Sequence, residues 1–205
     1  MSMVHRPRRV GVMGGTFDPI HIGHLVAASE AMYRFQLDRV LFVPTGRPWQ
    51  KERYSAPEDR YAMTLLGAAS SPGFAVSRME IDRRGPTYTA DTMQQLRDFY
   101  GPEVGLYFIA GADAILRLHT WRAVERLSET TELIAVTRPG FDLEELEVRP
   151  GWPVVHTMRM PGISVSATEI RTRAAEGRPI DFLTPPDVVR FIRENRLYLD
   201  GTAGG

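Results

Sequence analysis

Two histidines three residues apart are the side chains best suited to chemistry in this sequence. His21 and His24 stand at the end of the segment G-G-T-F-D-P-I-H-I-G-H. In the first turn of a helix this spacing projects both imidazoles to one side, where both can donate hydrogen bonds to one bound phosphate group. Two zinc ligands would also fit the spacing, but no glutamate follows His21 and the chain contains no cysteine. We therefore favour phosphate binding.

The residues before these histidines predict a cradle for phosphate oxygens. Gly14 and Gly15 have no Cβ atoms, so the backbone N–H groups of this segment, including those of Thr16 and Phe17, can approach an anion closely. The N-terminus of the helix that follows adds donors and a favourable dipole. Asp18 fits best as a structural residue that orders the loop through backbone N–H groups.

Strand and helix patterns alternate along the chain. Short apolar runs predict strands at residues 9–13, 40–43, 74–81, 104–110, 133–137 and 154–158. Apolar residues at helical spacing predict helices at residues 24–35, 59–69, 90–100, 113–118, 122–127 and 186–195. A further helix is expected after Ser166, which opens a capping box with Glu169: each side chain would accept from the backbone N–H of the other residue.

This alternation predicts an α/β fold, a doubly wound, Rossmann-like and mainly parallel sheet with helices on both faces. Sheets of this kind bind ligands at the carboxyl ends of their strands, near the topological switch point. The site should therefore lie in the loops after Met13, Val43, Ala110 and Met158.

Length and composition restrict the classes of protein that fit. The 205 residues, 43% of them hydrophobic, predict one domain over residues 1–205, with residues 1–8 and 201–205 as flexible tails. Basic and acidic residues balance at 25 each, which argues against nucleic-acid or membrane partners and requires any anion site to be local. With no cysteine and no long apolar run, we expect a cytoplasmic protein. A homo-oligomer is left open.

The eleven-residue segment closely resembles the motif of the nucleotidyltransferase superfamily in which H-x-G-H opens the first helix, and V-S-A-T-E-I-R resembles its later I-S-S-T-x-I-R segment. The resemblance implies in-line attack on the α-phosphorus of a nucleoside triphosphate, without a covalent enzyme intermediate and with Mg²⁺ held mainly by the phosphates. It assigns transition-state stabilisation to His24 and triphosphate binding to His21. Ser166 and Thr168 would donate to phosphate, and Arg171 would neutralise charge as pyrophosphate leaves.

A third segment, P-T-G-R-P-W-Q-K, follows the second predicted strand and contains Lys51, the only lysine of the chain. The family loop usually reads P-x-x-x-P-H-K, so Gln50 replaces a common histidine while Lys51 is retained. The resemblance implies contact of Lys51 with the triphosphate. A proline-rich loop without catalytic role is the alternative.

Other segments indicate the acceptor. G-P-T-Y-T-A-D-T resembles the G-P-S-Y-T-x-D-T segment of bacterial nicotinate mononucleotide adenylyltransferases, and G-A-D-A followed by W-R resembles that family's G-x-D and W-R positions. The implied substrates are ATP and nicotinate mononucleotide. The amides around Thr89 and Ala90 would receive the nicotinate carboxylate, and Trp121 would stack on the pyridine ring. Asp113 would bind a ribose hydroxyl, and Arg122 is the arginine of the W-R pair. Helix capping by Thr89 is the alternative for its segment.

Two other functions compete with this one. Pantetheine-phosphate adenylyltransferases and cytidylyltransferases use the same cradle with another acceptor or base, but they lack this pair of acceptor segments. A non-catalytic dinucleotide sensor would not need both histidines, and G-x-G-x-x-G is absent after the first predicted strand.

Overall fold

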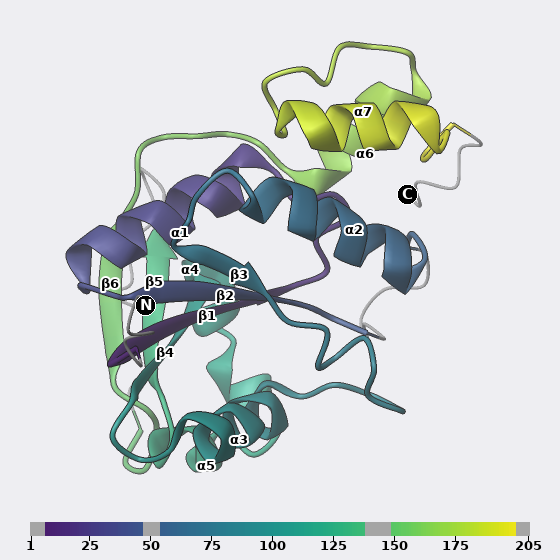
Figure 1. Cartoon of the computed structure of the whole chain (residues 1–205). Helices are drawn as coiled ribbons and strands as arrows, with labels where there is room; N and C mark the ends of the chain where they lie inside the picture. The colour runs from purple at the N-terminus through teal and green to yellow at the C-terminus, as the bar shows by residue number, and fades with distance from the viewer. Residues whose placement is uncertain (1–6, 47–53, 138–148, 200–205) are drawn as a thin grey trace, which may run out of the picture.

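The computed structural model describes residues 7–46, 54–137 and 149–199. Its core is a six-stranded sheet formed by β1 (Arg9–Gly15), β2 (Arg39–Pro44), β3 (Phe74–Val76), β4 (Gly105–Gly111), β5 (Glu132–Thr137) and β6 (Val155–Arg159). The strand order is β3-β2-β1-β4-β5-β6 and every neighbouring pair is parallel. The α/β doubly wound architecture is therefore confirmed (Figure 1).

The order of the strands fixes where a ligand can bind. Winding proceeds from β1 through β2 to β3 in one direction and then resumes on the other side of β1 with β4. Loops that leave the carboxyl ends of β1 and β4 therefore turn to opposite faces, the place where sheets of this kind usually bind ligands. The histidine segment follows β1, and the predicted ribose ligand Asp113 follows β4.

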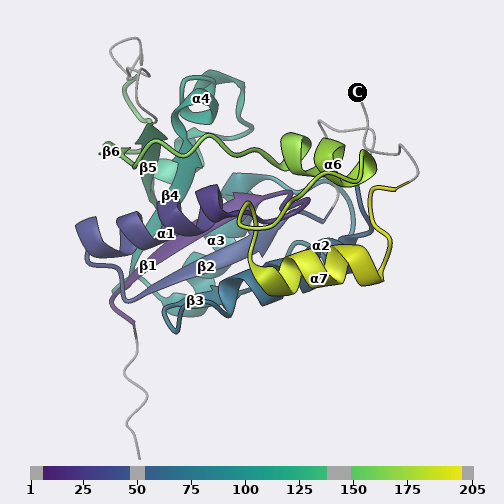
Figure 2. The same ribbon diagram turned by 90° about the horizontal axis from the view of Figure 1, so that it is seen from above.

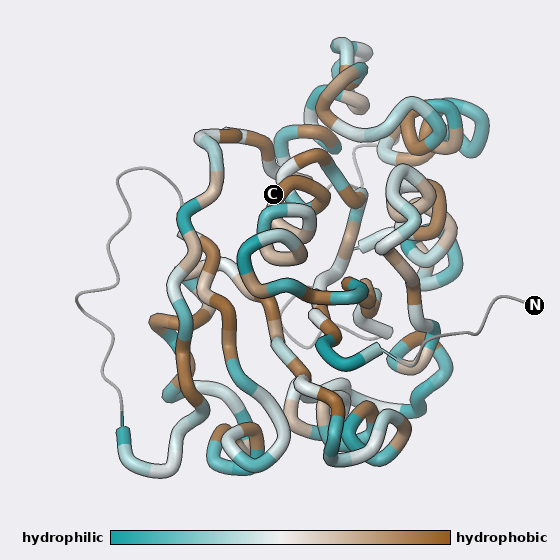
Figure 3. The backbone as a smooth tube through the Cα atoms, turned by 60° about the vertical axis from the view of Figure 1, so that its left-hand side comes forward, coloured by the Kyte–Doolittle hydropathy of each residue, from teal (hydrophilic) through white to brown (hydrophobic). Residues whose placement is uncertain are grey.

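Helices cover both faces of the sheet (Figure 1). One face carries α1 (Ile22–Arg34) and α2 (Pro57–Ala68), with α6 (Ala167–Ala175) and α7 (Pro186–Glu194) packed onto them. The other carries α3 (Thr89–Tyr100), α4 (Ala112–Ile115), α5 (Glu125–Ser128) and the 3₁₀ turn η1 (Leu118–Thr120). Along these helices hydrophobic and hydrophilic residues alternate, as expected when one side of each packs on the sheet (Figure 3).

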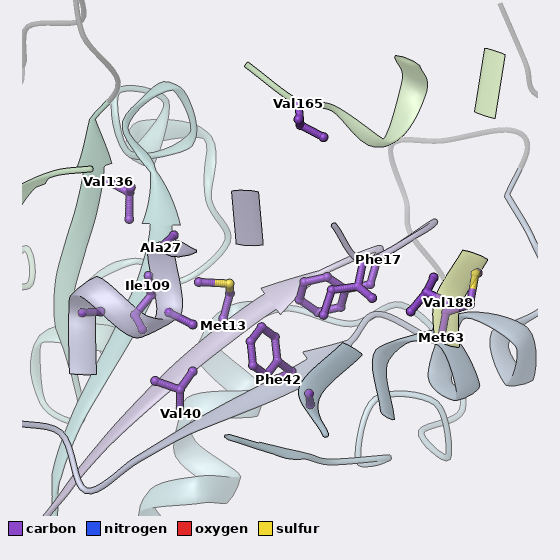
Figure 4. Packing of buried hydrophobic residues seen from close by; sticks show 14 of the residues in the cluster. Met13, Phe17, Ala27, Val40, Phe42, Met63, Ile109, Val136, Val165 and Val188 are labelled. Atoms are coloured by element: carbon purple, nitrogen blue, oxygen red, sulfur yellow. The ribbon is translucent and has the colours of Figure 1, made fainter. Parts of the chain in front are cut away.

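The sheet separates two hydrophobic cores because successive strand residues face opposite sides. In β2, Val40 and Phe42 pack beneath α1, whereas Leu41 and Val43 pack toward α3. Figure 4 shows the first core, in which Phe17 extends the row of β1 and β2 side chains toward Met63. This continuous packing connects the loop after β1 with α2 and α7.

Several boundaries differ from the sequence prediction. The strand predicted at residues 9–13 extends through Gly14 and Gly15, which both pair with β2. The strand predicted at 74–81 ends at Val76, and the chain then turns, with the N–H of Asp82 bonded to the carbonyl of Arg78 at 2.9 Å. The helices predicted at 113–118 and 122–127 are replaced by α4, η1 and α5. Such short segments carry too few periodic positions for sequence patterns to locate their ends.

The last two helices bring the end of the chain to the first loop. Viewed from above, α7 lies beside α2, and α6 lies near the N-terminal end of α1 (Figure 2). The N–H of Ile22, the first residue of α1, donates to the carbonyl of Leu183 at 3.1 Å. Within the described residues, no helix is long and apolar enough to cross a membrane.

Candidate active site

The two histidines form one stacked pair. The His21 and His24 rings lie 3.7 Å apart at an interplanar angle of 22°. The His21 backbone N–H donates to Nδ1 of His24 at 3.2 Å, so a neutral His24 carries its proton on Nε2, which makes that atom a hydrogen-bond donor. Phe17 supports the His24 ring edge-on at 5.0 Å. The pair is thus oriented by the backbone and by one aromatic ring.

The structure shows a different reason why glycine is required at positions 14 and 15. A Cβ on Gly14 would lie 3.2 Å from the Phe108 ring, and one on Gly15 would lie 3.0 Å from the Phe17 ring. Glycine is needed here because aromatic side chains occupy the space of a Cβ, rather than because that space faces an anion. Phe17 itself is 2% exposed and has φ of +50°, so only its backbone remains for a phosphate contact.

A buried arginine that the sequence analysis missed organises this loop. Arg60 of α2 is 0% exposed. Its guanidinium donates to the carbonyl oxygens of Thr16 at 3.0 Å, Thr45 at 2.6 Å, Gly46 at 3.0 Å and Ser55 at 3.1 Å. Burial lowers the pKa of Arg60, but a guanidinium stays protonated at any physiological pH. Arg60 therefore ties the loop after β1 to the segment after β2. No local sequence signal distinguishes it from a surface helix arginine.

The start of α6 brings Ser166, Thr168 and Arg171 to the same loop. Ser166 caps the helix by accepting from the N–H of Glu169 at 3.1 Å. The reciprocal half of the predicted capping box is wrong, because the Glu169 carboxylate pairs instead with Arg173 at 2.6 Å. One nitrogen of Arg171, Nη2, donates to the Thr168 hydroxyl at 3.3 Å.

The other end of the Arg171 guanidinium reaches across the fold. Nη1 of Arg171 donates to the carbonyl of Asp18 at 2.8 Å. The Asp18 carboxylate, 3% exposed, accepts from the backbone N–H of Ser55 at 3.1 Å and from the hydroxyl of Tyr198 at 2.7 Å. These contacts agree with the structural role expected for Asp18, which orders the loop through a backbone N–H.

A second group of predicted residues lines a cavity of about 670 Å³. Thr89 stands at the N-terminus of α3, and Trp121 and Arg122 follow η1. Trp121 packs edge-on against Phe108 at 5.8 Å, and the Arg122 guanidinium lies 4.6 Å from the ring centre of Tyr88, another lining residue. The cavity combines aromatic surface with a cation, which suits an aromatic anion.

The N-terminus of α3 supplies backbone donors to this cavity. Tyr88 is the N-cap, and Thr89 and Ala90 are the first two helical residues, whose N–H groups have no acceptor within the helix. The alternative of a side-chain cap by Thr89 is wrong, since Thr89 lies inside the helix. The Ala90 side chain is 3% exposed in the core, so only its N–H can contact a ligand.

Asp113 does not line this cavity. Its exposed carboxylate pairs with Arg117 at 3.7 Å and lies over Gly111 at the end of β4, where a Cβ would meet Oδ1 at 2.6 Å. The aspartate thus lies at the carboxyl edge of the sheet, and its ion-pair partner Arg117 lines the cavity.

A buried carboxylate supports the N-terminus of α3. Glu80 is 7% exposed and accepts from the hydroxyl of Thr92 at 2.6 Å, and Thr92 accepts from Arg83 at 3.0 Å. Burial raises the pKa of Glu80, although its hydrogen bonds act in the opposite direction. Gly46 allows this packing, because a Cβ there would lie 2.0 Å from the carbonyl oxygen of Glu80. No sequence pattern around Glu80 predicts this role.

Lys51 lies outside the described residues. Within the described ranges, no group of three or more histidines, aspartates or glutamates is arranged to hold a metal ion. The Asp18 carboxylate accepts hydrogen bonds from the backbone N–H of Ser55 and from the hydroxyl of Tyr198.

The structure combines a doubly wound sheet with two stacked histidines of an H-x-G-H segment after the first strand. The family model described as cytidylyltransferase-like matches residues 12–173, so the chain is a nucleotidyltransferase of this class. Curated relatives identify a narrower family within this class. A "Probable nicotinate-nucleotide adenylyltransferase" of Corynebacterium kroppenstedtii is 52% identical over 93% of this chain and 91% of that protein. One of Moorella thermoacetica, with the same description, is 51% identical over 98% of each. The chain belongs to the nicotinate-nucleotide adenylyltransferase family.

Solved structures agree on the fold. The nicotinic acid mononucleotide adenylyltransferase of Plasmodium falciparum in complex with NaAD superposes with a TM-score of 0.77, covering 93% of this chain and 97% of that one. Sequence identity is 19%, so this likeness concerns the arrangement of strands and helices rather than individual side chains.

Proposed function

We propose that the protein transfers the adenylyl group of ATP to nicotinate mononucleotide, forming nicotinate adenine dinucleotide, a precursor of NAD, and pyrophosphate. The observation that carries the proposal is the stacked pair of His21 and His24 at the start of α1, next to the loop that Arg171 contacts. Family membership and the cavity beside α3 support the choice of acceptor.

The reaction is an in-line displacement. A phosphate oxygen of nicotinate mononucleotide attacks the α-phosphorus of ATP, and the bond from that phosphorus to the bridging oxygen breaks as pyrophosphate leaves with the electron pair. No general base is needed, because the attacking phosphate is already ionised, and no covalent enzyme intermediate forms. Catalysis consists of orientation and charge stabilisation.

Donors around the triphosphate stabilise the developing charge. Nε2 of His24 donates to an α-phosphate oxygen, and His21 and the backbone N–H groups of Thr16 and Phe17 bind the remaining oxygens. Each well-placed donor contributes about 2–4 kcal/mol to the transition state. Thr168 and Arg171 are proposed to bind the departing pyrophosphate, and Ser166 caps the helix that carries them.

The acceptor binds in the cavity beside α3. The pyridine ring stacks on Trp121, and its carboxylate receives the N–H groups of Thr89 and Ala90 at the positive end of the helix dipole. Arg122 adds positive charge at the same cavity. Asp113, at the end of β4, binds a ribose hydroxyl of the mononucleotide.

We further infer that Mg²⁺ enters on the phosphates of ATP, since the Asp18 carboxylate is occupied by Tyr198 and Ser55. The ion would neutralise phosphate charge. Lys51 is proposed to bind the triphosphate. A cytoplasmic location agrees with the absence of cysteine and can be checked by cell fractionation.

The test is pyrophosphate release from ATP and Mg²⁺ with nicotinate mononucleotide, nicotinamide mononucleotide or phosphopantetheine as acceptor. Selective turnover of nicotinate mononucleotide is expected. Turnover with phosphopantetheine alone would refute the acceptor while leaving the class intact. Absence of turnover with all three would favour a dinucleotide sensor.

A further inference from the structure

Tyr198, in the turn after α7, contacts the loop that carries the histidines. Tyr198 follows α7, is 7% exposed, and donates its hydroxyl to Oδ1 of Asp18 at 2.7 Å across 180 residues of sequence. The same hydroxyl lies 3.7 Å from the sulfur of Met63 in α2. Figure 2 shows that α7, which precedes Tyr198, runs beside α2.

The backbone of Tyr198 adopts a conformation that its side chain disfavours. Its φ is +70°, in the left-handed region that bulky residues rarely occupy. Such a conformation persists only where the surrounding structure holds it, and it is found most often at functional sites. The hydrogen bond to Asp18 and the packing on Met63 are the contacts that hold it here.

The Tyr198 hydroxyl also remains a hydrogen-bond donor at physiological pH. Burial and the negative charge of Asp18 raise the pKa of Tyr198 above its ordinary value, so the hydroxyl is protonated at physiological pH. Asp18 in turn presents its main-chain carbonyl to Nη1 of Arg171 at 2.8 Å. Tyr198, Asp18 and Arg171 thus form a chain of contacts from the end of the polypeptide to the phosphate site.

We propose that Tyr198 is a positioning residue for adenylyl transfer, holding Asp18 so that Arg171 is aligned on the triphosphate of ATP. The inference rests on the proposed role of Arg171. The turn after α7 then contributes to ATP binding through Asp18 and Arg171, although Tyr198 itself does not touch substrate. The acceptor cavity, on the other face of the sheet, does not depend on it.

Tyr198→Phe tests the proposal because it removes only the hydroxyl. Tyr107→Phe is the matched control: Tyr107 is 6% exposed, and its hydroxyl accepts from Arg9 at 2.6 Å near the amino ends of β1 and β4. We expect Tyr198→Phe to raise the Kd of MgATP, measured by calorimetry, and to lower kcat/KM for ATP, each by about tenfold, roughly the effect of losing one hydrogen bond to a charged group. The KM for nicotinate mononucleotide should stay within about twofold, as should every constant of Tyr107→Phe.

A double-mutant cycle separates positioning from general stability. In an Arg171→Ala background, Tyr198→Phe should change the Kd of MgATP by less than about twofold, because its effect passes through Arg171. An undiminished effect in that background, equal losses for both substrates, or behaviour like Tyr107→Phe would overturn the proposal. Asp18→Asn should reproduce the ATP-specific loss, and serves if Tyr198→Phe does not fold.

The binding measurement distinguishes this inference from the proposed reaction. A wild-type protein that binds MgATP but does not use nicotinate mononucleotide would refute the reaction while the calorimetric comparison still decides the role of Tyr198. A wild-type protein that does not bind MgATP would overturn both.

Discussion

At the scale of single residues, the site depends on side chains whose orientation is fixed before substrate arrives. His24 is held by a backbone N–H at Nδ1, by the stacked ring of His21 and by the edge of Phe17. A donor that is already oriented does not have to reorganise as charge develops in the transition state, which is the main source of electrostatic catalysis.

Replacement of His24 by alanine should therefore affect turnover far more than binding. We expect kcat to fall by about 10²–10³, as for loss of one oxyanion donor, while the Kd of MgATP changes only a few-fold. Steady-state kinetics and calorimetry measure the two effects. His156→Ala, on β6 and paired with Glu132, is the control and should leave kcat unchanged. Equal losses in kcat and binding would argue that His24 only binds ATP.

At the scale of elements, the loops that hold the site are tied together by buried polar side chains. Arg60 gathers four carbonyl oxygens from the segments after β1 and β2, and Glu80 holds Thr92 near the start of α3. Loops alone rarely keep catalytic geometry, because their backbone groups lack the regular partners of helices and strands. Arg60 supplies such partners for the segments after β1 and β2, whereas Glu80 holds the side chain of Thr92 in the first turns of α3.

Loss of the Arg60 guanidinium should be costly for stability. Arg60→Met leaves four buried or half-buried carbonyl groups without their donor, so we expect the free energy of unfolding to fall by about 3 kcal/mol or more. Urea denaturation measures the change. Arg190→Met, which loses one exposed ion pair with Asp187, should cost about 0.5 kcal/mol or less. Similar costs for both variants would contradict the structural role of Arg60.

Glu80 predicts a specific dependence of stability on pH. A carboxyl whose pKa is higher in the folded than in the unfolded state stabilises the fold at low pH, and this contribution is lost as the pH rises through the folded-state pKa. Burial raises the pKa of Glu80 above its ordinary value of 4.5. Glu80→Gln should therefore gain stability relative to wild type as the pH rises from 4 to 8, by about 1.4 kcal/mol per unit of pKa elevation.

Denaturant titrations of both proteins across this pH range give the difference in their free energies of unfolding. The contributions of all other ionisable groups cancel in this difference. The exposed Glu103→Gln is the control. The difference in the free energy of unfolding between Glu80→Gln and wild type could instead stay constant with pH or grow in favour of wild type. Either result would show that the pKa of Glu80 is not raised in the folded protein.

At the scale of the whole molecule, the sheet separates two hydrophobic cores, one around α1, α2, α6 and α7 and the other around α3 and α5. On the proposed assignment, ATP binds on the side of the first core and the acceptor binds on the side of the second. Because contacts from Gly14 to Tyr198 contribute, the site exists only in the complete fold.

Binding of ATP should consequently stabilise the entire protein. At a concentration of MgATP one hundred times its Kd, the native state gains about 2.7 kcal/mol, which corresponds to a rise in Tm of about 5–10 °C for a chain of this length. Differential scanning fluorimetry measures the shift. MgCTP at equal concentration is the control for the base, and an equal shift with MgCTP would favour the cytidylyltransferase alternative.

Much of the site could be predicted from the sequence because its signals are local. His21, His24 and Arg171 belong to short motifs at strand ends and helix starts, and the alternation of strand and helix patterns predicted the architecture that places them at one edge. The helix starts follow from the same local chemistry, as with Ser166.

Only the tertiary structure decided which buried polar groups support those motifs. Arg60, Glu80 and Tyr198 look in the sequence like ordinary surface residues, because nothing local indicates that they are buried or what they contact. Tyr198 and Asp18 are 180 residues apart, and a hydrogen bond between them exists only when α7 packs beside α2. Capping and periodicity depend on neighbours in sequence, whereas burial and long-range hydrogen bonds depend on which segments the fold brings together.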